Sequence, residues 1–323
     1  MKAALYERLG AARDVIRIAE VECPEPGPGE VRVRVRLSGI NPTDWKSRSG
    51  ATARPLEGFQ IPHHDGAGEV DAVGEGVDPR RLGERVWIWM AAAGRRWGTA
   101  AEWTVVPEAQ AVRLPDSASW ELGACLGVPA LTAHRCLFAD GDLEGQSVLV
   151  AGGAGAVGHF AIELAHHQGA RVVATVSGDA KAKMARSAGA DLVVNYREPG
   201  AAERVHSFAP DLARVVEVNL AANLQLDTSV AGPGTVVAVY AADGPDPILP
   251  VRACMSANLV LRFVLLYGVP RPALLQAVAD VSGALEAGAL SALPVHRFPL
   301  DACAEAQDAV ESGVVGKVVL EVG

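Results

Sequence analysis

The sequence has few cysteines, and their spacing matches no metal-binding or redox motif. No two of the five stand in a CxxC arrangement; they are Cys23, Cys125, Cys136, Cys254 and Cys303. Scattered thiols of this kind are typical of a reduced protein that keeps them buried. We therefore expect a cytoplasmic protein without a disulfide framework.

The chain also lacks an excess of basic residues, a long apolar run and an apolar leader. Its net charge of −9 argues against the basic surface that a nucleic-acid backbone requires, so we expect no nucleic-acid partner. No uncharged apolar run reaches the roughly 18 residues of a membrane span. The opening "MKAALYERLG" lacks the apolar centre of a signal peptide, so none is expected. A length of 323 residues predicts about two globular domains.

The first third contains short segments in which apolar and polar residues alternate between glycines and prolines. They are "VRVRVRLSGI" (31–40), "GEVDAVGEGV" (68–77), "ERVWIWM" (84–90) and "AEWTVVP" (101–107). Alternation with a period of two predicts strands, so this part should form a β-rich, partly barrel-like domain. Arg32, Arg34 and Arg36 should lie on the solvent face of the first strand.

From about residue 146 the pattern alternates between apolar strands and amphipathic helices. A helix precedes this part, with an expected cap at Asp116 or Ser117. Strands are predicted over 147–152, 170–176, 191–196, 213–219 and 234–240, and helices over 156–169, 179–190 and 272–290. Such alternation predicts an α/β fold with a doubly wound parallel sheet covered by helices on both faces.

A glycine-rich turn joins the first of these strands to its helix. "VLVAGGAGAVGHFAIELA" carries Gly153, Gly155 and Gly158 in GxGxxG spacing. Glycines at these places let the backbone turn tightly and approach a pyrophosphate, whose charge then lies at the helix N-terminus. The motif therefore predicts dinucleotide binding by Gly152, Gly153, Ala154, Gly155, Ala156, Val157 and Gly158.

The residues after the second strand indicate which dinucleotide. NAD-selective sites usually place an Asp or Glu there for the ribose 2′-hydroxyl. This sequence reads "ATVSGDAKAK", with Thr175 and Ser177 in that place and Lys181 shortly after. A hydroxyl and a lysine would hold a 2′-phosphate that a carboxylate would repel, so NADP(H) is favoured. Asp179 is expected to cap the following helix.

Several segments together resemble the medium-chain dehydrogenase/reductase superfamily, in particular its zinc-free quinone oxidoreductase (zeta-crystallin-like) branch. Besides the glycine turn they are "SGINPTDWKSRSG", "HHDGAGEVDAVGEGV" with "GERVW", "LGVPALTAH", "GADLVVNYRE", "LVLRFVLLY" and "AVESGVVGKVVLEV". The resemblance implies a GroES-like β-rich catalytic domain, discontinuous over 1–122 with 290–323. A Rossmann NADP-binding domain would cover 123–289, with the active site in the cleft between the two.

The same resemblance bears on the histidines of "IPHHDGAGEV". Zinc-containing relatives carry a cysteine in "GxCHTD", a histidine in "GHE" and another cysteine before the glycine turn. Here Asn41 replaces the first cysteine and the last falls at or near Val128, while His64 and Asp65 are retained. One imidazole and one carboxylate do not fill a catalytic zinc shell of three protein ligands. We therefore expect no metal, and His63 and His64 as residues in or near the cleft.

Without a metal, the reaction should use an acceptor that is already electrophilic. Hydride addition to a quinone or an enone leaves a delocalised anion, which needs only positioned hydrogen-bond donors. By resemblance, Asn41 lies beside the nicotinamide or the substrate as a positioning residue, with no acid or base assigned. Trp45, Lys46 and His64 would contact substrate; many relatives carry tyrosine at the place of Lys46.

The resemblance also assigns cofactor contacts outside the glycine turn. Three residues match positions that hold the adenosine 2′-phosphate: Ser177, Lys181 and Tyr196. Five match positions along the rest of the cofactor: Thr132, Asn219, Tyr240, Phe263 and Leu265. The expected function is an NADPH-dependent reductase of a quinone or related α,β-unsaturated carbonyl.

Other functions stay open from the sequence. A 2-enoyl-thioester reductase would need a basic patch for its carrier, which the acidic chain does not favour. A non-catalytic NADPH-binding sensor or structural protein is an alternative of a different class. Alcohol dehydrogenase is least favoured, because it would need zinc. The apolar segments 234–240 and 259–267 could supply an edge strand that pairs across a twofold axis, so a homodimer is expected.

Overall fold

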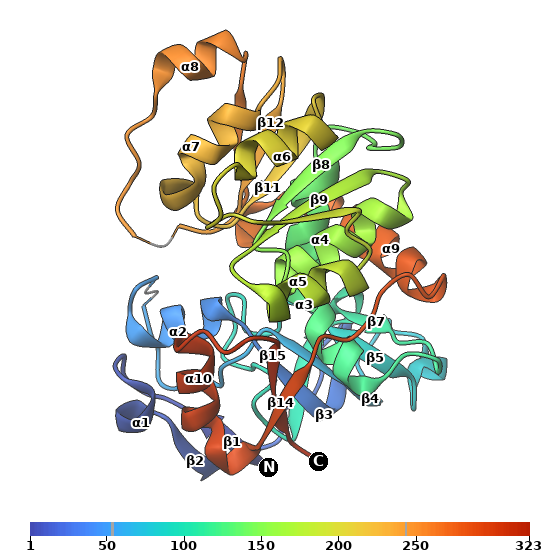
Figure 1. The fold of residues 1–323 in the computed structure, drawn as a ribbon. Coiled ribbons are helices and arrows are strands. Elements are labelled where there is room, and N and C mark those ends of the chain that lie inside the picture. Colours follow the sequence, from blue (N-terminus) through green and yellow to red (C-terminus); the bar gives the residue numbers. More distant parts are fainter. Residues whose placement is uncertain (53–54, 243) are drawn as a thin grey trace. The chain divides into compact units, whose positions relative to one another are not determined.

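The computed structural model describes residues 1–52, 55–242 and 244–323, and the chain divides into two compact units (Figure 1). Unit 1 comprises Met1–Pro129 and Ala292–Gly323, and unit 2 comprises Ala130–Ser291. The domain boundaries predicted from the sequence, between residues 122 and 123 and between residues 289 and 290, stay a prediction. None of the described helices combines the length and the apolar character needed to cross a membrane.

Unit 1 is built around a seven-stranded sheet in which β14, β15, β3, β4, β5 and β7 follow one another and β6 pairs with β3. A separate two-stranded sheet joins β1 to β2. The strands are β1 (Lys2–Leu5), β2 (Arg17–Glu20), β3 (Glu30–Ile40), β4 (Asp65–Val73), β5 (Arg85–Ile88), β6 (Trp103–Pro107), β7 (Ala111–Arg113), β14 (Val295–Pro299) and β15 (Lys317–Glu321). The helices are α1 (Ala12–Val15), α2 (Pro42–Ser49) and α10 (Cys303–Glu311).

The long strand β3 shows why alternating residues form this sheet. Its valines Val31, Val33 and Val35 are completely buried, and the arginines between them face outward. Arg32 and Arg34 make ion pairs with carboxylates of the neighbouring strand β4, so the polar face is stabilised across the strands. The predicted solvent face of this strand is confirmed.

Unit 2 contains a six-stranded, fully parallel sheet in the order β10-β9-β8-β11-β12-β13. Its strands are β8 (Ser147–Ala151), β9 (Arg171–Val176), β10 (Leu192–Asn195), β11 (Leu212–Glu217), β12 (Val236–Val239) and β13 (Val260–Phe263). Its helices are α4 (Ala156–His167), α5 (Asp179–Ser187), α6 (Ala201–Phe208), α7 (Leu220–Val230), α8 (Val251–Ser256) and α9 (Arg271–Glu286). The strand order reverses between β8 and β11, as in a doubly wound dinucleotide-binding sheet, so the predicted fold class is confirmed.

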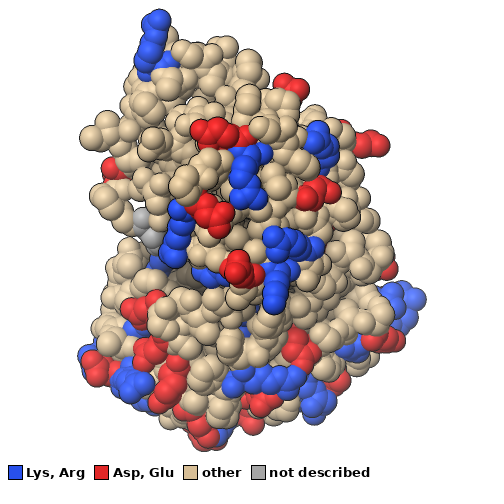
Figure 2. Space-filling view, in the orientation of Figure 1, with Lys and Arg blue, Asp and Glu red and all other residues tan. Residues whose placement is uncertain are grey.

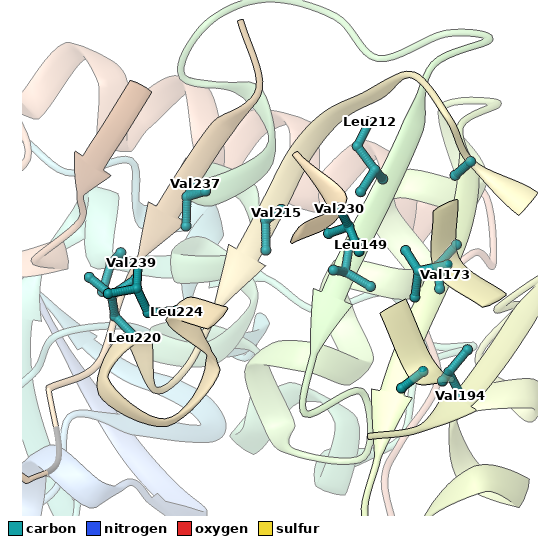
Figure 3. Close-up of a cluster of buried hydrophobic side chains, with 13 residues drawn as sticks. Leu149, Val173, Val194, Leu212, Val215, Leu220, Leu224, Val230, Val237 and Val239 are labelled. Carbon is teal, nitrogen blue, oxygen red and sulfur yellow. The ribbon is translucent and has the colours of Figure 1, made fainter. Parts of the chain in front are cut away.

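Branched apolar residues form the core on one side of the parallel sheet (Figure 3). Strand residues such as Leu149, Val173 and Val215 are fully buried there, and α7 covers them with Leu220 and Leu224. Parallel strands are buried on both faces, which explains why they appear in the sequence as continuous apolar runs. The same packing holds the parallel strands side by side. Their carboxyl ends, and the loops that follow them, therefore lie along one edge of the sheet.

The helix α3 (Trp120–Phe138) begins later than the sequence suggested. Ser119 accepts a hydrogen bond from the backbone N–H of Leu122 at 3.2 Å, as an N-cap does. The expected cap at Asp116 or Ser117 was therefore wrong by two to three residues.

On the face shown in Figure 2, basic and acidic side chains are interspersed.

Candidate functional site

The glycine turn connects β8 to α4 in the way that its spacing predicts. Gly152 has a φ of +69°, a left-handed conformation that favours glycine. A Cβ on Gly158 would lie 2.4 Å from the carbonyl oxygen of Gly152, so only glycine allows the helix to start this close to the turn. A Cβ on Gly155 would meet only the Gly152 carbonyl oxygen, at 3.4 Å. This residue therefore has a different role from Gly158.

Gly155 is the N-cap of α4 and provides no side chain to cap the helix. Ala154 precedes it, and Ala156 and Val157 are the first two residues of the helix. Free N–H groups at a helix N-terminus, together with the helix dipole, favour an anionic group such as a pyrophosphate. The residues around the turn thus fit the phosphates of a dinucleotide.

Three predicted residues lie close together after the neighbouring strands β9 and β10. Ser177 directly follows β9, and Tyr196 directly follows β10, where its N–H donates to the Val176 carbonyl at 3.1 Å. Lys181 lies in the first turn of α5. A hydroxyl, an ammonium and a phenol at adjacent strand ends are donors for a phosphate group.

Another residue in this region, Arg197, was not assigned from the sequence. The guanidinium of Arg197 lies over the Tyr196 ring, 5.7 Å from its centroid, and adds a second cation to the strand ends. Asp179 is the first residue of α5, and Gly178 occupies the capping position. The expected capping role of the Asp179 side chain is therefore wrong, although a carboxylate in the first turn still suits the helix dipole.

The other predicted cofactor residues follow the remaining strands or lie in α3. Asn219 is the N-cap of α7, where its side chain accepts from the Ala222 N–H at 3.2 Å. Tyr240 follows β12, Phe263 ends β13, and Leu265 comes two residues later. Phe263 and Leu265 are 71% and 70% exposed, so both can contact a bound molecule, whereas Thr132 is buried in α3.

Unit 1 contains a buried polar cluster around Asn41. The Asn41 side-chain amide donates from Nδ2 to Asp65 Oδ2 at 2.7 Å and accepts from the Lys317 ammonium through Oδ1. Both Asp65 oxygens accept from the Val128 N–H, at 2.8 and 3.0 Å, and Lys317 Nζ lies 4.0 Å from Asp65. Asn41, Asp65 and Lys317 are each no more than 3% exposed. Asn41 therefore holds a buried carboxylate and a buried ammonium together.

Burial changes the protonation of the two carboxyl groups near Asn41. It raises the pKa of Asp65 to about 6, against the opposing charge of Lys317 and the amide hydrogen bonds. Burial likewise raises the pKa of Asp44 to about 8, although the Asn41 backbone N–H donates to its carboxylate at 2.7 Å. Lys317 was not assigned a role from the sequence. A lysine at the start of the apolar segment "KVVLEV" was the signal that could have identified it.

The two adjacent histidines have different surroundings. His63 has a φ of +78°, and its Nδ1 lies 2.9 Å from Ser38 Oγ and its Nε2 3.1 Å from the Gln307 amide nitrogen. Burial lowers the pKa of His63 to about 3, so the ring is neutral and belongs to a polar network inside unit 1. His64 is 8% exposed.

The residues at the family's zinc positions do not fit a catalytic zinc ion. The Asn41 amide already binds Asp65 and Lys317, and the Lys317 ammonium would repel a second cation beside Asp65. Within residues 1–52, 55–242 and 244–323, no group of three His, Cys, Asp or Glu side chains is placed to hold a metal.

The expected substrate residues Trp45 and Lys46 lie in α2, with the Lys46 ammonium 5.7 Å from the Trp45 ring centroid.

Comparison with protein families gives two matches along the chain. Residues 27–116 match the alcohol dehydrogenase GroES-like domain, and residues 156–282 match the family described as zinc-binding dehydrogenase. The first match falls in unit 1 and the second in unit 2.

Individual relatives cover nearly the whole chain. A quinone oxidoreductase of Pseudomonas aeruginosa is 32% identical over 303 residues, which is 91% of each protein. The crystal structure of an NAD-dependent alcohol dehydrogenase has a TM-score of 0.90 at 29% identity and covers 100% of both chains. A mycobacterial protein solved in complex with NADPH has a TM-score of 0.85 at 29% identity, covering 99% of this chain and 100% of its own.

Proposed function

Because the chain belongs to the quinone oxidoreductase branch of the medium-chain dehydrogenase/reductase superfamily, we propose that it is an NADPH-dependent reductase of a quinone or related α,β-unsaturated carbonyl. The observation that carries the proposal is the set of phosphate donors after β9 and β10. Ser177, Lys181 and Tyr196 stand there, and β9 ends in Val176 rather than in an acidic residue. The complex of the mycobacterial relative with NADPH supports the same cofactor.

In the proposed binding mode the glycine turn and the N-terminus of α4 hold the pyrophosphate. Ser177, Lys181 and Tyr196 hold the adenosine 2′-phosphate, while Asn219, Tyr240, Phe263 and Leu265 line the remainder. Bound NADPH supplies the hydride. The chain's own contribution is to orient cofactor and acceptor, since positioning of two reactants alone can lower a barrier by several kcal/mol (about 7–11 in favourable cases).

We propose further that the reaction is independent of zinc. The cluster of Asn41, Asp65 and Lys317 has a cation of its own and lacks a metal donor set. A quinone needs no strong Lewis acid, because its reduction leaves a delocalised anion that hydrogen-bond donors can stabilise. Asn41 stays a positioning residue in this proposal, acting by holding Asp65 and Lys317. Trp45, Lys46 and His64 are the proposed substrate contacts.

The direct test measures oxidation of NADPH and of NADH by the purified protein. The acceptors are a panel of ortho- and para-quinones, a 2-enoyl thioester and an aldehyde, each with and without a chelator. Quinone turnover that prefers NADPH and resists the chelator supports the proposal. Turnover of the thioester instead would favour the enoyl reductase. Chelator-sensitive turnover of the aldehyde would refute zinc independence.

A matched pair of lysines tests the cofactor assignment. Lys181→Ala should raise the KM for NADPH at least tenfold and leave the KM for NADH unchanged, because only NADPH carries the 2′-phosphate. Lys183→Ala, an exposed lysine of the same helix, is the control and should change neither. Equal effects of the two substitutions would contradict the assignment of Lys181.

In the turnover assay of the native protein, tight NADPH binding without turnover of any acceptor would favour a sensing or structural role.

We also propose a homodimer joined through β13. This strand lies at the end of the parallel sheet and pairs with β12 alone among the described strands, and Val260 and Phe263 on it are exposed. An exposed apolar edge invites pairing with a second strand. Light scattering should give twice the chain mass for the native protein and a monomer for Val260→Asp. Leu82→Asp, at an exposed leucine of unit 1, is the control and should remain dimeric.

A further inference from the structure

Unit 2 contains a pair of buried carboxyl groups that the proposed reaction does not use. Glu217 is the last residue of β11 and is 0% exposed, and Asp227 lies in α7 and is 1% exposed. Acidic side chains are almost never this deeply buried unless a partner compensates their charge. The nature of that partner is therefore informative.

The partner of each carboxyl group is the other. Asp227 lies close enough to Glu217 for a side-chain hydrogen bond that shifts the pKa of both groups, and neither oxygen of Asp227 nor Oε2 of Glu217 has an N–H donor. Glu217 Oε1 accepts from the backbone N–H of Asn219 and from the Asn223 amide, the latter at 2.8 Å. A carboxylate has no hydrogen to donate, so two carboxyl groups can hydrogen-bond only when one of them carries a proton.

The surroundings of the pair do not neutralise a second negative charge. The Tyr240 hydroxyl, beyond the end of β12, faces Glu217, and the Cys136 thiol of α3 faces Tyr240 in turn. Burial raises the pKa of Cys136 to about 12 and raises that of Tyr240 well above its ordinary value, so both are neutral at physiological pH. Within the described parts of the chain, no lysine or arginine makes an ion pair or hydrogen bond with either carboxyl. The site therefore accommodates one negative charge on the two carboxyl groups together, and not two.

We propose that Glu217 and Asp227 share one proton, and that this shared proton positions the Asn219 turn at the carboxyl edge of the parallel sheet. Asp227 carries the proton and donates it to Glu217 Oε2, which has no other partner. Glu217 then presents Oε1 to the Asn219 N–H, and Asn219 caps α7. The functional part of the proposal rests on the proposed function, in which Asn219 lines the cofactor. Both acids are positioning residues.

The shared proton makes the Asn219 turn sensitive to alkali. Burial raises the pKa of Asp227 to about 9, and burial raises that of Glu217 as well. The folded protein therefore keeps a proton that the unfolded chain releases, and this contribution to stability is lost as the pH rises to about 9. Loss of the proton to solvent leaves two negative charges in contact. We expect the Kd for NADPH to be constant below pH 8 and to rise by up to about tenfold per pH unit above 9.

The experiment uses three substitutions of the full chain. Asp227→Asn keeps a permanent N–H donor toward Glu217 and should abolish the alkaline rise in the Kd. Asp227→Leu removes the donor and should weaken NADPH binding at every pH. Asp211→Asn, at an exposed acid just before β11, is the control and should behave as the native protein does.

Two measurements without cofactor separate this proposal from the proposed function. The infrared spectrum at pH 7 should contain a protonated carboxyl band of the pair in addition to that of Asp44, and the band of the pair should disappear in Asp227→Asn and persist in Asp211→Asn. Protection factors of the amide hydrogens at residues 219–223, which are corrected for the intrinsic pH dependence of exchange, should fall in Asp227→Leu and, above pH 9, in the native protein, but not in Asp227→Asn. Absence of the band, or exchange that ignores Asp227, overturns the proposal even if NADPH binds. Failure of NADPH binding with both results intact overturns only the proposed function.

Discussion

Replacing Lys317 with methionine removes the ammonium group beside the buried Asp65 carboxyl and leaves the length of the side chain nearly unchanged. In the native protein burial raises the pKa of Asp65 to about 6, and the charge of Lys317 is the largest influence that opposes it. Without the ammonium, the pKa of Asp65 should rise further. The substitution should therefore destabilise unit 1 to an extent that depends on pH.

The size of the effect follows from proton linkage. Below pH 6 Asp65 is protonated in both folded proteins, so their stability difference does not change with pH. Above pH 6 the native protein carries an ionised Asp65, while the variant must still hold the proton that its unfolded chain releases. Each pH unit adds about 1.4 kcal/mol to the difference, so a variant in which Asp65 titrates at or above pH 8 loses about 3 kcal/mol more at pH 8 than at pH 5.

Urea unfolding followed by tryptophan fluorescence measures this difference in unit 1. All six tryptophans lie in that unit: Trp45, Trp87, Trp89, Trp97, Trp103 and Trp120. Lys183→Met is the control for removing a lysine, and Lys317→Met combined with Asp65→Asn should show no pH-dependent loss. A Lys317→Met destabilisation that is equal at pH 5 and pH 8 would refute the role of Lys317 as the counter-charge of Asp65.

Three further substitutions test the glycine turn and the buried carboxyl group of Asp44. Gly158→Ala should destabilise unit 2 by about 1–3 kcal/mol, because its Cβ would meet the Gly152 carbonyl at 2.4 Å, and thermal unfolding measures this loss. Gly155→Ala should leave the unfolding temperature nearly unchanged and weaken NADPH binding in a fluorescence titration; the opposite pattern for these two would contradict the assigned roles. Burial raises the pKa of Asp44 to about 8, so stability from this group is lost as the pH rises from about 4 to 8. Asp44→Asn should therefore gain up to about 4 kcal/mol on the native protein between pH 5 and pH 8 in urea unfolding.

The sequence was informative wherever a local pattern determines the structure. The alternation of Val31, Val33 and Val35 with arginines identified β3, because a strand places successive residues on opposite faces. The GxGxxG spacing between an apolar run and a helix located the turn between β8 and α4. The family resemblance then indicated which residues after β9 and β10 come together. The structure places these residues after neighbouring strands, and their roles as cofactor contacts stay predictions.

The sequence did not indicate which buried polar side chains contact one another in the folded protein. Asn41 is still predicted to lie beside the cofactor or the substrate, but the sequence did not indicate that its amide also holds Asp65 and Lys317, which is 276 residues away. No periodicity relates these positions, and one sequence contains no signal for their pairing. The pair of Glu217 and Asp227 was also missed, because no helix was predicted where α7 lies and the contact of Asp227 with the end of β11 could therefore not be expected.

The place of β15 in the sheet has a consequence for the order in which the protein is made. β15 pairs with β3 and brings Lys317 to Asn41, so a ribosome must add 276 residues, including all of unit 2, after Asn41 before this contact can form. At about 5–20 residues per second, that takes roughly a quarter of a minute to a minute. During this time β3 lacks one of its neighbours and Asp65 lacks its counter-charge. The nascent first unit therefore presents an open strand edge to chaperones while the parallel sheet of unit 2 can already fold.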